Sequence, residues 1–368
     1  MHDFVFVLEQ TLGHAAHSKN LERVVRADPD IDATFLHVDF ESRHAWERIP
    51  GLRNWSFRAS WAARRGLRRQ LAARPADSIF IHTQVAALLA TDIMRRVPTV
   101  VSLDATPVNF DRVGSAYSHS VSNPALEAAK RAVNRRTFGA AAGIVTWCRW
   151  AADSLREDYG VPGEKIRVIP PGVDVSVFAP PAARERQGPI RLLFVGGDLE
   201  RKGGLDLLQA LEGLRGQVEL DMVTGANPDT SHRGVKVRIH RGLRPQSPEL
   251  VRLFLEADLF VLPARGDCLP QAIAEAMASG LPVVSTPVGA ITELVRDGET
   301  GLLVPPGSPA RLTQALAALI ADPARRAAMG RAGLDLARRD HDMARNNRSI
   351  LALMGDLTKT HGLALSAS

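Results

Sequence analysis

Residues 258–286 read DLFVLPARGDCLPQAIAEAMASGLPVVST, and two kinds of local pattern alternate along them. Short apolar runs rich in β-branched residues stand at 258–264 and 281–286, and each predicts a strand. The segment between them, 270–280, predicts a helix with Pro270 in its first turn. A strand, a helix and a second strand in this order form a βαβ unit, so the stretch predicts a parallel sheet covered by helices.

The same alternation continues along most of the 368 residues. We therefore predict an α/β protein with two Rossmann-like, doubly wound parallel-sheet domains that face a cleft. The final residues, 358–368, are expected to fray. Further strands are expected at 4–8, 31–38, 78–83, 99–104, 142–147, 166–170, 190–197, 218–225 and 235–240, and further helices at 14–27, 84–96, 125–139, 205–214, 247–257, 309–322, 323–339 and 343–357.

A linker composition interrupts the alternation near residue 170. Residues 170–189, PPGVDVSVFAPPAARERQGP, hold five prolines and predict a domain boundary. The expected division is an N-terminal domain at 1–170, a linker at 171–189 and a C-terminal domain at 190–338. Residues 339–368 are expected to form a helix that returns to the N-terminal domain, followed by the frayed tail.

The composition is that of a globular protein, with 45% hydrophobic and 23% charged residues. The net charge of +6 favours phosphorylated ligands, an anionic membrane surface or nucleic acid as partners. Aromatic residues are only 5% of the chain, too few for a base-stacking groove, so nucleic acid is the less favoured partner. The two cysteines form neither a disulfide framework nor a metal-ligand pattern, which indicates a reducing, cytoplasmic compartment.

One segment is a candidate for contact with a membrane surface, although no segment is predicted to cross a membrane. No window reaches the roughly 18 uninterrupted apolar residues that a span requires, and the first ten residues predict a strand and not a signal peptide. Residues 53–75 combine Trp55, Phe57 and Trp61 with arginines, as an interfacial helix does. The alternative is an ordinary solvated helix. The arginines are Arg58, Arg64, Arg65, Arg68, Arg69 and Arg74.

Two acids, Asp267 and Glu275, lie on either side of the start of the helix at 270–280. Glu275 is placed to accept hydrogen bonds from a vicinal diol such as ribose, and Asp267 from the hydroxyls of a sugar ring. With Pro270 as the first helical residue, Leu269 is the N-cap and has no side-chain acceptor. The backbone N–H groups nearby are then available to an anion or a hydroxyl. The alternative is that both acids only complement the helix dipole. The backbone donors are those of Leu269, Gln271 and Ala272.

A second constellation occupies residues 192–208, LLFVGGDLERKGGLDLL. A strand ends in glycines that include Gly197, and Arg201 and Lys202 stand directly before a Gly-Gly pair and a new helix. Two cations and flexible backbone at a helix start predict a diphosphate site. No cluster of metal-binding acids accompanies them, so no metal is expected and the cations would stabilise the departing phosphate. The alternative is a loop with exposed basic residues.

Two strand ends in the first half supply further candidates. Gly13 and His14 follow the first strand and open a helix, and Gly13 permits close approach of a ligand to the backbone. Asp104 ends the strand at 99–104, a position where site residues gather in α/β proteins. Ordinary capping and turn roles are the alternative. The surroundings of Gly13 do not form a GxGxxG fingerprint, which disfavours a dinucleotide ligand.

Together these motifs resemble those of the retaining glycosyltransferases of family 4, which have the GT-B architecture of two Rossmann-like domains. The matching motifs are Gly-His at 13–14, VIPPGVDVSVF at 168–178, FVGGDLERKGG at 194–204 and the whole run from 257 to 308. The resemblance implies that Glu275 binds the nucleotide ribose, and that Arg201 and Lys202 contact the diphosphate. It also implies that the donor sugar is held by Asp267 with the backbone at Leu269, Pro270 and Gln271.

The chain departs from the family pattern at several of these positions. Asp267 replaces the first glutamate of a Glu, seven residues, Glu pattern, Gly197 replaces an arginine, and Asp104 stands where the family often has a histidine. Pro171 and Ala290 also replace an asparagine and a glycine. Neither the change at Pro171 nor the change at Ala290 removes a charged group from the expected site.

The implied function is transfer of a hexose, with retention and without a metal, from a UDP-sugar or GDP-sugar to a glycan, lipid-linked or small-molecule acceptor in cell-surface polysaccharide synthesis. His14 or Asp104 is expected to orient the acceptor or to stabilise positive charge on the sugar. The first alternative is a non-catalytic nucleotide-sugar-binding protein, which the changes at Asp267 and Asp104 keep open. A nicotinamide oxidoreductase and a basic membrane or nucleic-acid adaptor are the others.

Overall fold

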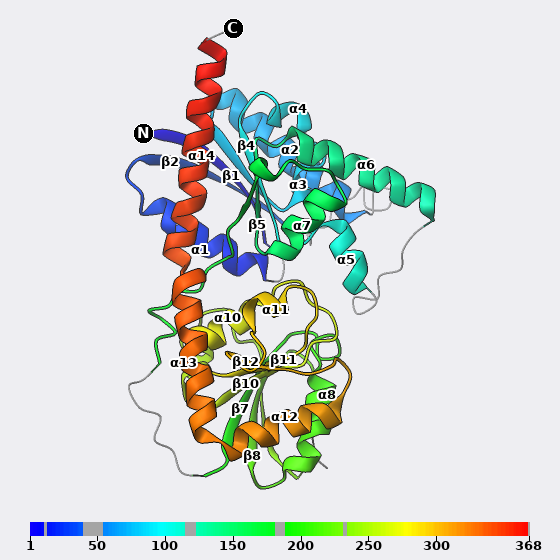
Figure 1. Ribbon diagram of the computed structural model, residues 1–368. Helices are drawn as coiled ribbons and strands as arrows, with labels where there is room; N and C mark the ends of the chain where they lie inside the picture. The colour runs from blue at the N-terminus through cyan, green and yellow to red at the C-terminus, as the bar shows by residue number, and fades with distance from the viewer. Residues whose placement is uncertain (11–12, 40–53, 115–122, 181–187, 231–233, 367–368) are drawn as a thin grey trace. The chain divides into compact units, whose positions relative to one another are not determined.

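The computed structural model describes residues 1–10, 13–39, 54–114, 123–180, 188–230 and 234–366. The chain divides into two compact units, each built on its own parallel sheet (Figure 1). The first unit consists of residues 1–109, 121–171 and 343–368, and the second of residues 110–120 and 172–342. Residues 339–342 thus belong to the second unit, and the return to the first begins at Met343 instead of residue 339.

Six parallel strands form the sheet of the first unit, in the order β2-β1-β3-β4-β5-β6. Every neighbouring pair in it is parallel. Because all strands point the same way, the loops that follow them gather at one edge of the sheet. The strands are β1 (His2–Glu9), β2 (Ile31–Val38), β3 (Ser78–His82), β4 (Thr99–Leu103), β5 (Gly143–Thr146) and β6 (Ile166–Val168).

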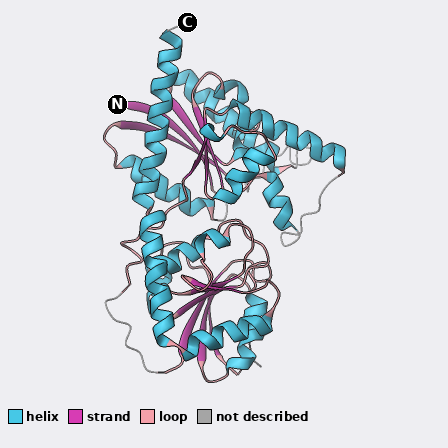
Figure 2. Ribbon diagram, viewed as in Figure 1, coloured by secondary structure: helices cyan, strands magenta, loops and turns pink. Residues whose placement is uncertain are grey.

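Helices cover both faces of this sheet (Figure 2). On β1 the side chains alternate: Phe4 and Phe6 join a core with Met354 of the C-terminal helix α14, whereas Val5 and Val7 join a core on the opposite face. Burial on both faces explains why the inner strands are mainly apolar, whereas the edge strand β2 is only partly buried and contains Asp32 and His37. The helices are α1 (His14–Arg26), α2 (Trp55–Ala73), α3 (Gln84–Ala87), α4 (Thr91–Met94), α6 (Pro124–Ala140), α7 (Arg149–Glu157) and α14 (Met343–Ser366). A further helix, α5 (Pro107–Val113), begins in the first unit and ends in residues of the second.

The second unit repeats the architecture with the strand order β12-β11-β10-β7-β8-β9. Its sheet is also entirely parallel. Strands β7 and β10 are neighbours, so the loops that follow them lie side by side. The strands are β7 (Ile190–Val195), β8 (Val218–Val223), β9 (Lys236–His240), β10 (Leu259–Leu262), β11 (Val283–Ser285) and β12 (Gly301–Leu303), and the helices α8 (Gly204–Ala210), α9 (Pro248–Glu256), α10 (Gln271–Ala278), α11 (Ile291–Leu294), α12 (Pro309–Ala321) and α13 (Pro323–Asp340).

Two expectations about helices of the first unit are wrong. The helix expected at 84–96 is divided into α3 and α4, because α2 captures both backbone groups of Leu89: its N–H donates to Ser60 Oγ at 2.6 Å, and its carbonyl accepts from Arg64. The tail expected to fray is helical as far as Ser366, as the continuation of α14. Within the described residues, no helix has both the length and the apolar character that crossing a bilayer requires.

Candidate functional site

The candidate donor site lies in the second unit, where the loop after β7 meets the loop after β10. The two loops are joined by a backbone hydrogen bond from the Arg265 N–H to the Arg201 carbonyl, 2.8 Å long. A second anchor is the Arg265 guanidinium, which donates to both carboxylate oxygens of the buried Asp206 in α8, at 2.8 and 2.6 Å. Paired strand ends and these bonds therefore bring residues 196–203 beside residues 263–270.

Arg201 is held in this junction by partners from both loops. Its Nε donates to Asp198 at 3.2 Å, and its Nη1 donates to the Gly266 carbonyl at 3.1 Å. The same Nη1 lies 4.0 Å from an oxygen of Asp267, and only 10% of the side chain is exposed. The guanidinium is thus a fixed positive charge at the strand ends.

Lys202 pairs directly with Asp267 across the two loops. The second oxygen of Asp267 accepts the Cys268 backbone N–H at 3.0 Å. Both side chains are largely buried, with 17% of Lys202 and 9% of Asp267 exposed. Three of the residues named from the sequence, Arg201, Lys202 and Asp267, therefore form one charged cluster.

The start of α10 lies next to this cluster in the chain and has no side-chain cap. The N-cap is Pro270, so the helix begins at Gln271, one residue later than expected, and Leu269 is not the cap. The correction leaves the chemistry unchanged, because proline and leucine both lack a side-chain acceptor. The first turn contains no acid, so neither Asp267 nor Glu275 lies where a dipole-complementing residue would stand.

Glu275 is buried inside α10, with 8% of its surface exposed. Burial raises the pKa of its carboxyl group from the usual 4.5 to about 7. Within the described residues, this carboxyl group has no hydrogen-bond or ion-pair partner. A ligand that donates hydrogen bonds to a buried carboxyl group of this kind strongly stabilises its charged form.

Two glycines of the loop after β7 have different surroundings. Gly203 caps α8 with a φ of +75°, and a Cβ placed on it would lie 1.9 Å from the Pro263 carbonyl oxygen. Gly197 has no atom within 4 Å of such a Cβ, so its backbone borders open space. Gly203 is thus required by the fold, whereas Gly197 leaves room for a ligand.

The other sequence candidates meet in the first unit. Gly13 is the N-cap of α1, which begins at His14, and the His14 Nε2 lies 4.0 Å from an oxygen of Asp104 after β4. The sequence reasoning missed the residues around them: His17 of α1, His82 at the end of β3 and Trp147 after β5. Attention to every strand end would have identified His82 and Trp147.

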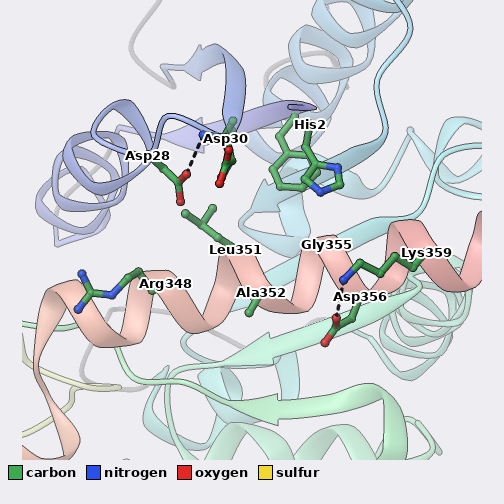
Figure 3. Close-up of a pocket in the computed structure, with 11 residues that line it drawn as sticks. His2, Asp28, Asp30, Arg348, Leu351, Ala352, Gly355, Asp356 and Lys359 are labelled. Carbon is green, nitrogen blue, oxygen red and sulfur yellow. Dashed lines mark hydrogen bonds and ion pairs between the residues drawn. The ribbon is translucent and has the colours of Figure 1, made fainter.

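Within the described residues, no group of three or more His, Cys, Asp or Glu side chains is arranged to hold a metal ion. A groove of about 400 Å³ lies between α14 and the amino ends of β1 and β2, lined by His2, Asp30 and Lys359 among others (Figure 3). It lies at the sheet edge opposite to the loops that follow the strands, and so away from the candidate residues.

Two family models match the chain. The model described as Glycosyltransferase Family 4 matches residues 11–177, and the one described as Glycosyl transferases group 1 matches residues 189–322. A relative, the D-inositol 3-phosphate glycosyltransferase 1 of Catenulispora acidiphila, is 32% identical over 292 residues, which are 70% of this chain and 68% of the relative. The chain spans about half the length of other curated relatives that it matches, 54% and 52% for two of them.

Solved structures resemble the whole chain. A sucrose-phosphate synthase from Thermosynechococcus elongatus has a TM-score of 0.77 at 17% identity, over 98% of this chain and 100% of that one. The Anabaena protein HepE, in complex with UDP and glucose, has a TM-score of 0.69 at 16% identity, over 97% of this chain and 100% of that one. At such low identity the likeness concerns the fold, and it confirms the α/β GT-B architecture expected from the sequence.

Proposed function

This chain belongs to the group 1, family 4 glycosyltransferases, and on that premise we propose that it is a retaining hexosyltransferase. It transfers a hexose from a nucleoside-diphosphate sugar to a hydroxyl group of a glycan, a lipid-linked sugar or a small molecule, in cell-surface polysaccharide or glycoconjugate synthesis. The observation that carries the proposal is the cluster of Arg201, Lys202 and Asp267 beside the uncapped start of α10.

The cluster suits a diphosphate because it concentrates positive charge at a helix start. Arg201 and Lys202 supply two cations, and the first N–H groups of α10 supply donors at the positive end of the helix dipole. In the structure Lys202 is paired with Asp267. On donor binding the ammonium exchanges this carboxylate for a phosphate oxygen, and Asp267 accepts hydrogen bonds from the sugar hydroxyls.

Glu275 supplies the complementary site for the ribose. Its carboxylate accepts hydrogen bonds from the two vicinal hydroxyls, which replace the solvation that burial has removed. Gly197 leaves room for the phosphates to approach the backbone. The site therefore contacts the ribose and the diphosphate, which all nucleoside-diphosphate sugars share. This agrees with either a UDP-sugar or a GDP-sugar as donor.

The proposed reaction moves negative charge onto the departing diphosphate. The bond between the anomeric carbon and the diphosphate oxygen breaks, and its electron pair passes to the diphosphate. Arg201, Lys202 and the helix-start amides stabilise that charge without a metal. The acceptor hydroxyl attacks the same face of the sugar and gives its proton to a phosphate oxygen, which retains the configuration. His14 and Asp104 serve the acceptor side.

Contact with a membrane surface is a further part of the proposal, in agreement with a cytoplasmic enzyme that modifies lipid-linked acceptors. The buried side of α2 consists of small and apolar residues, whereas Trp55, Phe57 and Trp61 are 50%, 39% and 38% exposed on its outer side. The Arg65 guanidinium lies over the Trp61 ring at 5.3 Å. Exposed aromatic rings among arginines suit an anionic lipid surface. Residue 53 of the segment lies outside the described residues.

The alternative is a nucleotide-sugar-binding protein without turnover, and one assay separates the two. Purified protein is incubated with UDP-glucose, UDP-galactose, GDP-mannose and related donors, with D-inositol 3-phosphate or a cell-envelope extract as acceptor source. Released nucleoside diphosphate is measured for the natural protein and Arg201→Ala. The control is Arg252→Ala, which removes an exposed arginine of α9 from the same unit.

Release from one donor, lost in Arg201→Ala and kept in Arg252→Ala, is the expected result. Tight binding of a donor without release under every condition would instead identify a binding protein. Equal release by Arg201→Ala would refute the role assigned to the cation cluster.

A further inference from the structure

Three histidine rings and one indole pack together in the first unit. His82 and Trp147 are stacked with ring centres 5.1 Å apart and an angle of 12° between their planes. His14 and His17, both from α1, lie 4.9 and 5.0 Å from the His82 ring and 5.2 and 5.1 Å from Trp147. We call these four residues the histidine cluster. It lies where α1 begins and where β3 and β5 end.

Only one member of the cluster can reach a ligand. His82 has no exposed surface and His17 has 3%, whereas 16% of the His14 side chain is exposed. Burial lowers the pKa of His17 to about 3 and, with the neighbouring histidines, lowers the pKa of His82 well below its usual value. Both buried rings are therefore neutral at physiological pH, and His14 is the member that faces outward.

The buried His82 is hydrogen-bonded to this outward-facing ring. His82 Nε2 lies 2.8 Å from His14 Nδ1. The other ring nitrogen, His82 Nδ1, is buried beside Ser102 of the neighbouring strand β4 and has no hydrogen-bond partner among the described residues. A neutral imidazole carries one proton, so this hydrogen bond has two possible directions. With the proton of His82 on Nδ1, Nε2 of His82 accepts from Nδ1–H of His14.

This arrangement determines what His14 offers to a ligand. With its proton on Nδ1, neutral His14 carries a lone pair on Nε2, which lies 4.0 Å from the Oδ2 of Asp104. Asp104 is 23% exposed, so both acceptors are accessible. Two acceptors at this separation do not bond each other, and each can receive one hydrogen bond from adjacent hydroxyl groups. Glu9, at the end of β1, is engaged by the Thr83 hydroxyl at 2.7 Å.

We propose that His14 Nε2 and the Asp104 carboxylate together bind a vicinal diol of the acceptor, and that His82 is the positioning residue that keeps the His14 lone pair on Nε2. The inference rests on the proposed function, since it names the acceptor chemistry of that reaction. The favoured acceptor is a sugar or a cyclitol with two neighbouring hydroxyls, one beside the group that reacts.

The test uses the full chain labelled with ¹⁵N-histidine at pH 8, because the two nitrogens of a neutral ring have widely different ¹⁵N shifts. His14 signals are assigned by their loss in His14→Gln. The expected result is a proton on His14 Nδ1 in the natural protein, and its movement to Nε2 in His82→Phe. His82→Gln, which keeps an acceptor, retains the natural tautomer, and so does His17→Phe, the matched buried control.

Binding is tested in the same spectra with myo-inositol, which has vicinal hydroxyls, and with cyclohexanol, which has the ring and one hydroxyl. Myo-inositol is expected to shift the ¹⁵N signal of His14 Nε2 in the natural protein but not in His82→Phe. Cyclohexanol is expected to leave this signal unchanged in both proteins. An unchanged His14 tautomer in both His82 variants, or equal shifts with both probes, would overturn the inference. Nucleotide release is measured on the same samples: a diol response without release would refute the proposed function alone.

Discussion

The ammonium group of Lys202 pairs with the carboxylate of Asp267, although 65 residues separate them in the chain. The pair connects the loop after β7 to the loop after β10, and Arg201 lies 4.0 Å from the same carboxylate oxygen. In the structure the acid therefore occupies the place among the cations that we assign to a diphosphate oxygen. Stability and donor binding are coupled through this carboxylate.

Removal of Lys202 is expected to affect activity and stability through different partners. Lys202→Met should lower kcat/KM by about 10²- to 10³-fold, because the Lys202 ammonium no longer stabilises the negative charge that develops on the departing diphosphate. It should also lower the free energy of unfolding by on the order of 2 kcal/mol, because Asp267 stays buried without its partner. Turnover and urea denaturation measure the two effects.

The double variant Lys202→Met/Asp267→Asn separates them. It should recover most of the lost stability and none of the activity. Lys236→Met, which breaks an exposed pair with Glu219, is the control and should change neither by much. Recovery of activity in the double variant would contradict the assignment of Lys202 to the diphosphate.

The two glycines of the β7 loop are expected to respond in opposite ways to alanine. Gly203→Ala places a Cβ against the Pro263 carbonyl at a positive φ, so it should lower the free energy of unfolding by more than about 2 kcal/mol. Gly197→Ala meets open space and should leave thermal unfolding unchanged, while it weakens nucleotide binding by occupying the proposed phosphate approach. Unimpaired nucleotide binding by a folded Gly197→Ala would remove that residue from the site.

Glu275 is expected to make stability depend on pH. Because its folded pKa of about 7 lies above the usual 4.5, the protonated group favours the folded state at low pH, and this contribution is lost as pH rises through 7. The stability of Glu275→Gln relative to the natural protein should therefore increase by about 3 kcal/mol between pH 4.5 and pH 8. Chemical denaturation at several pH values gives the difference.

The same group should release a proton when a nucleotide binds near pH 6.5, since the ribose hydroxyls favour the charged carboxylate. Calorimetry in two buffers of different ionisation enthalpy measures this release. Glu275→Gln corrects for protons from the phosphates themselves. Equal proton release by the natural protein and by Glu275→Gln would show that Glu275 does not contact the nucleotide.

The exposed side of α2 is expected to bind anionic vesicles. Phe57→Ser and Trp61→Ser should each weaken binding by about tenfold, because a buried aromatic ring contributes about 1.5 kcal/mol or more. Leu126→Ser removes a 50% exposed apolar side chain from α6 and is the matched control. Co-sedimentation with phosphatidylserine vesicles at two salt concentrations tests this, and absence of binding by the natural protein would exclude the membrane contact.

Most strands could be predicted because they are short runs rich in apolar and β-branched residues between helical stretches, and the range 31–38 coincides with the edge strand β2. The division of the helix at 84–96 could not, because it depends on Ser60 and Arg64 of α2, more than twenty residues away. The helical tail was missed for a similar reason. Its Thr358 hydroxyl lies 3.3 Å from the Asp77 carbonyl, a long-range contact that local composition does not reveal.

The charged residues of the donor site could be named individually, but not their pairing. That Lys202 meets Asp267 follows from the position of β10 beside β7 in the sheet, which the spacing of the motifs does not specify. The burial that raises the pKa of Glu275 is likewise a property of packing around α10. The position of His82 at the end of β3 is the signal in the sequence that was overlooked, whereas its role could not be predicted because it depends on the contact with His14.

The most direct test of the central claim follows the anomeric protons by NMR while the protein acts on the donor identified in the release assay, with its acceptor present. The account predicts that the donor signal is replaced by a product signal of the same anomeric configuration, at the rate of nucleoside diphosphate release, and that Arg201→Ala abolishes both. An inverted product, or a donor signal that persists while the donor remains tightly bound, would contradict it.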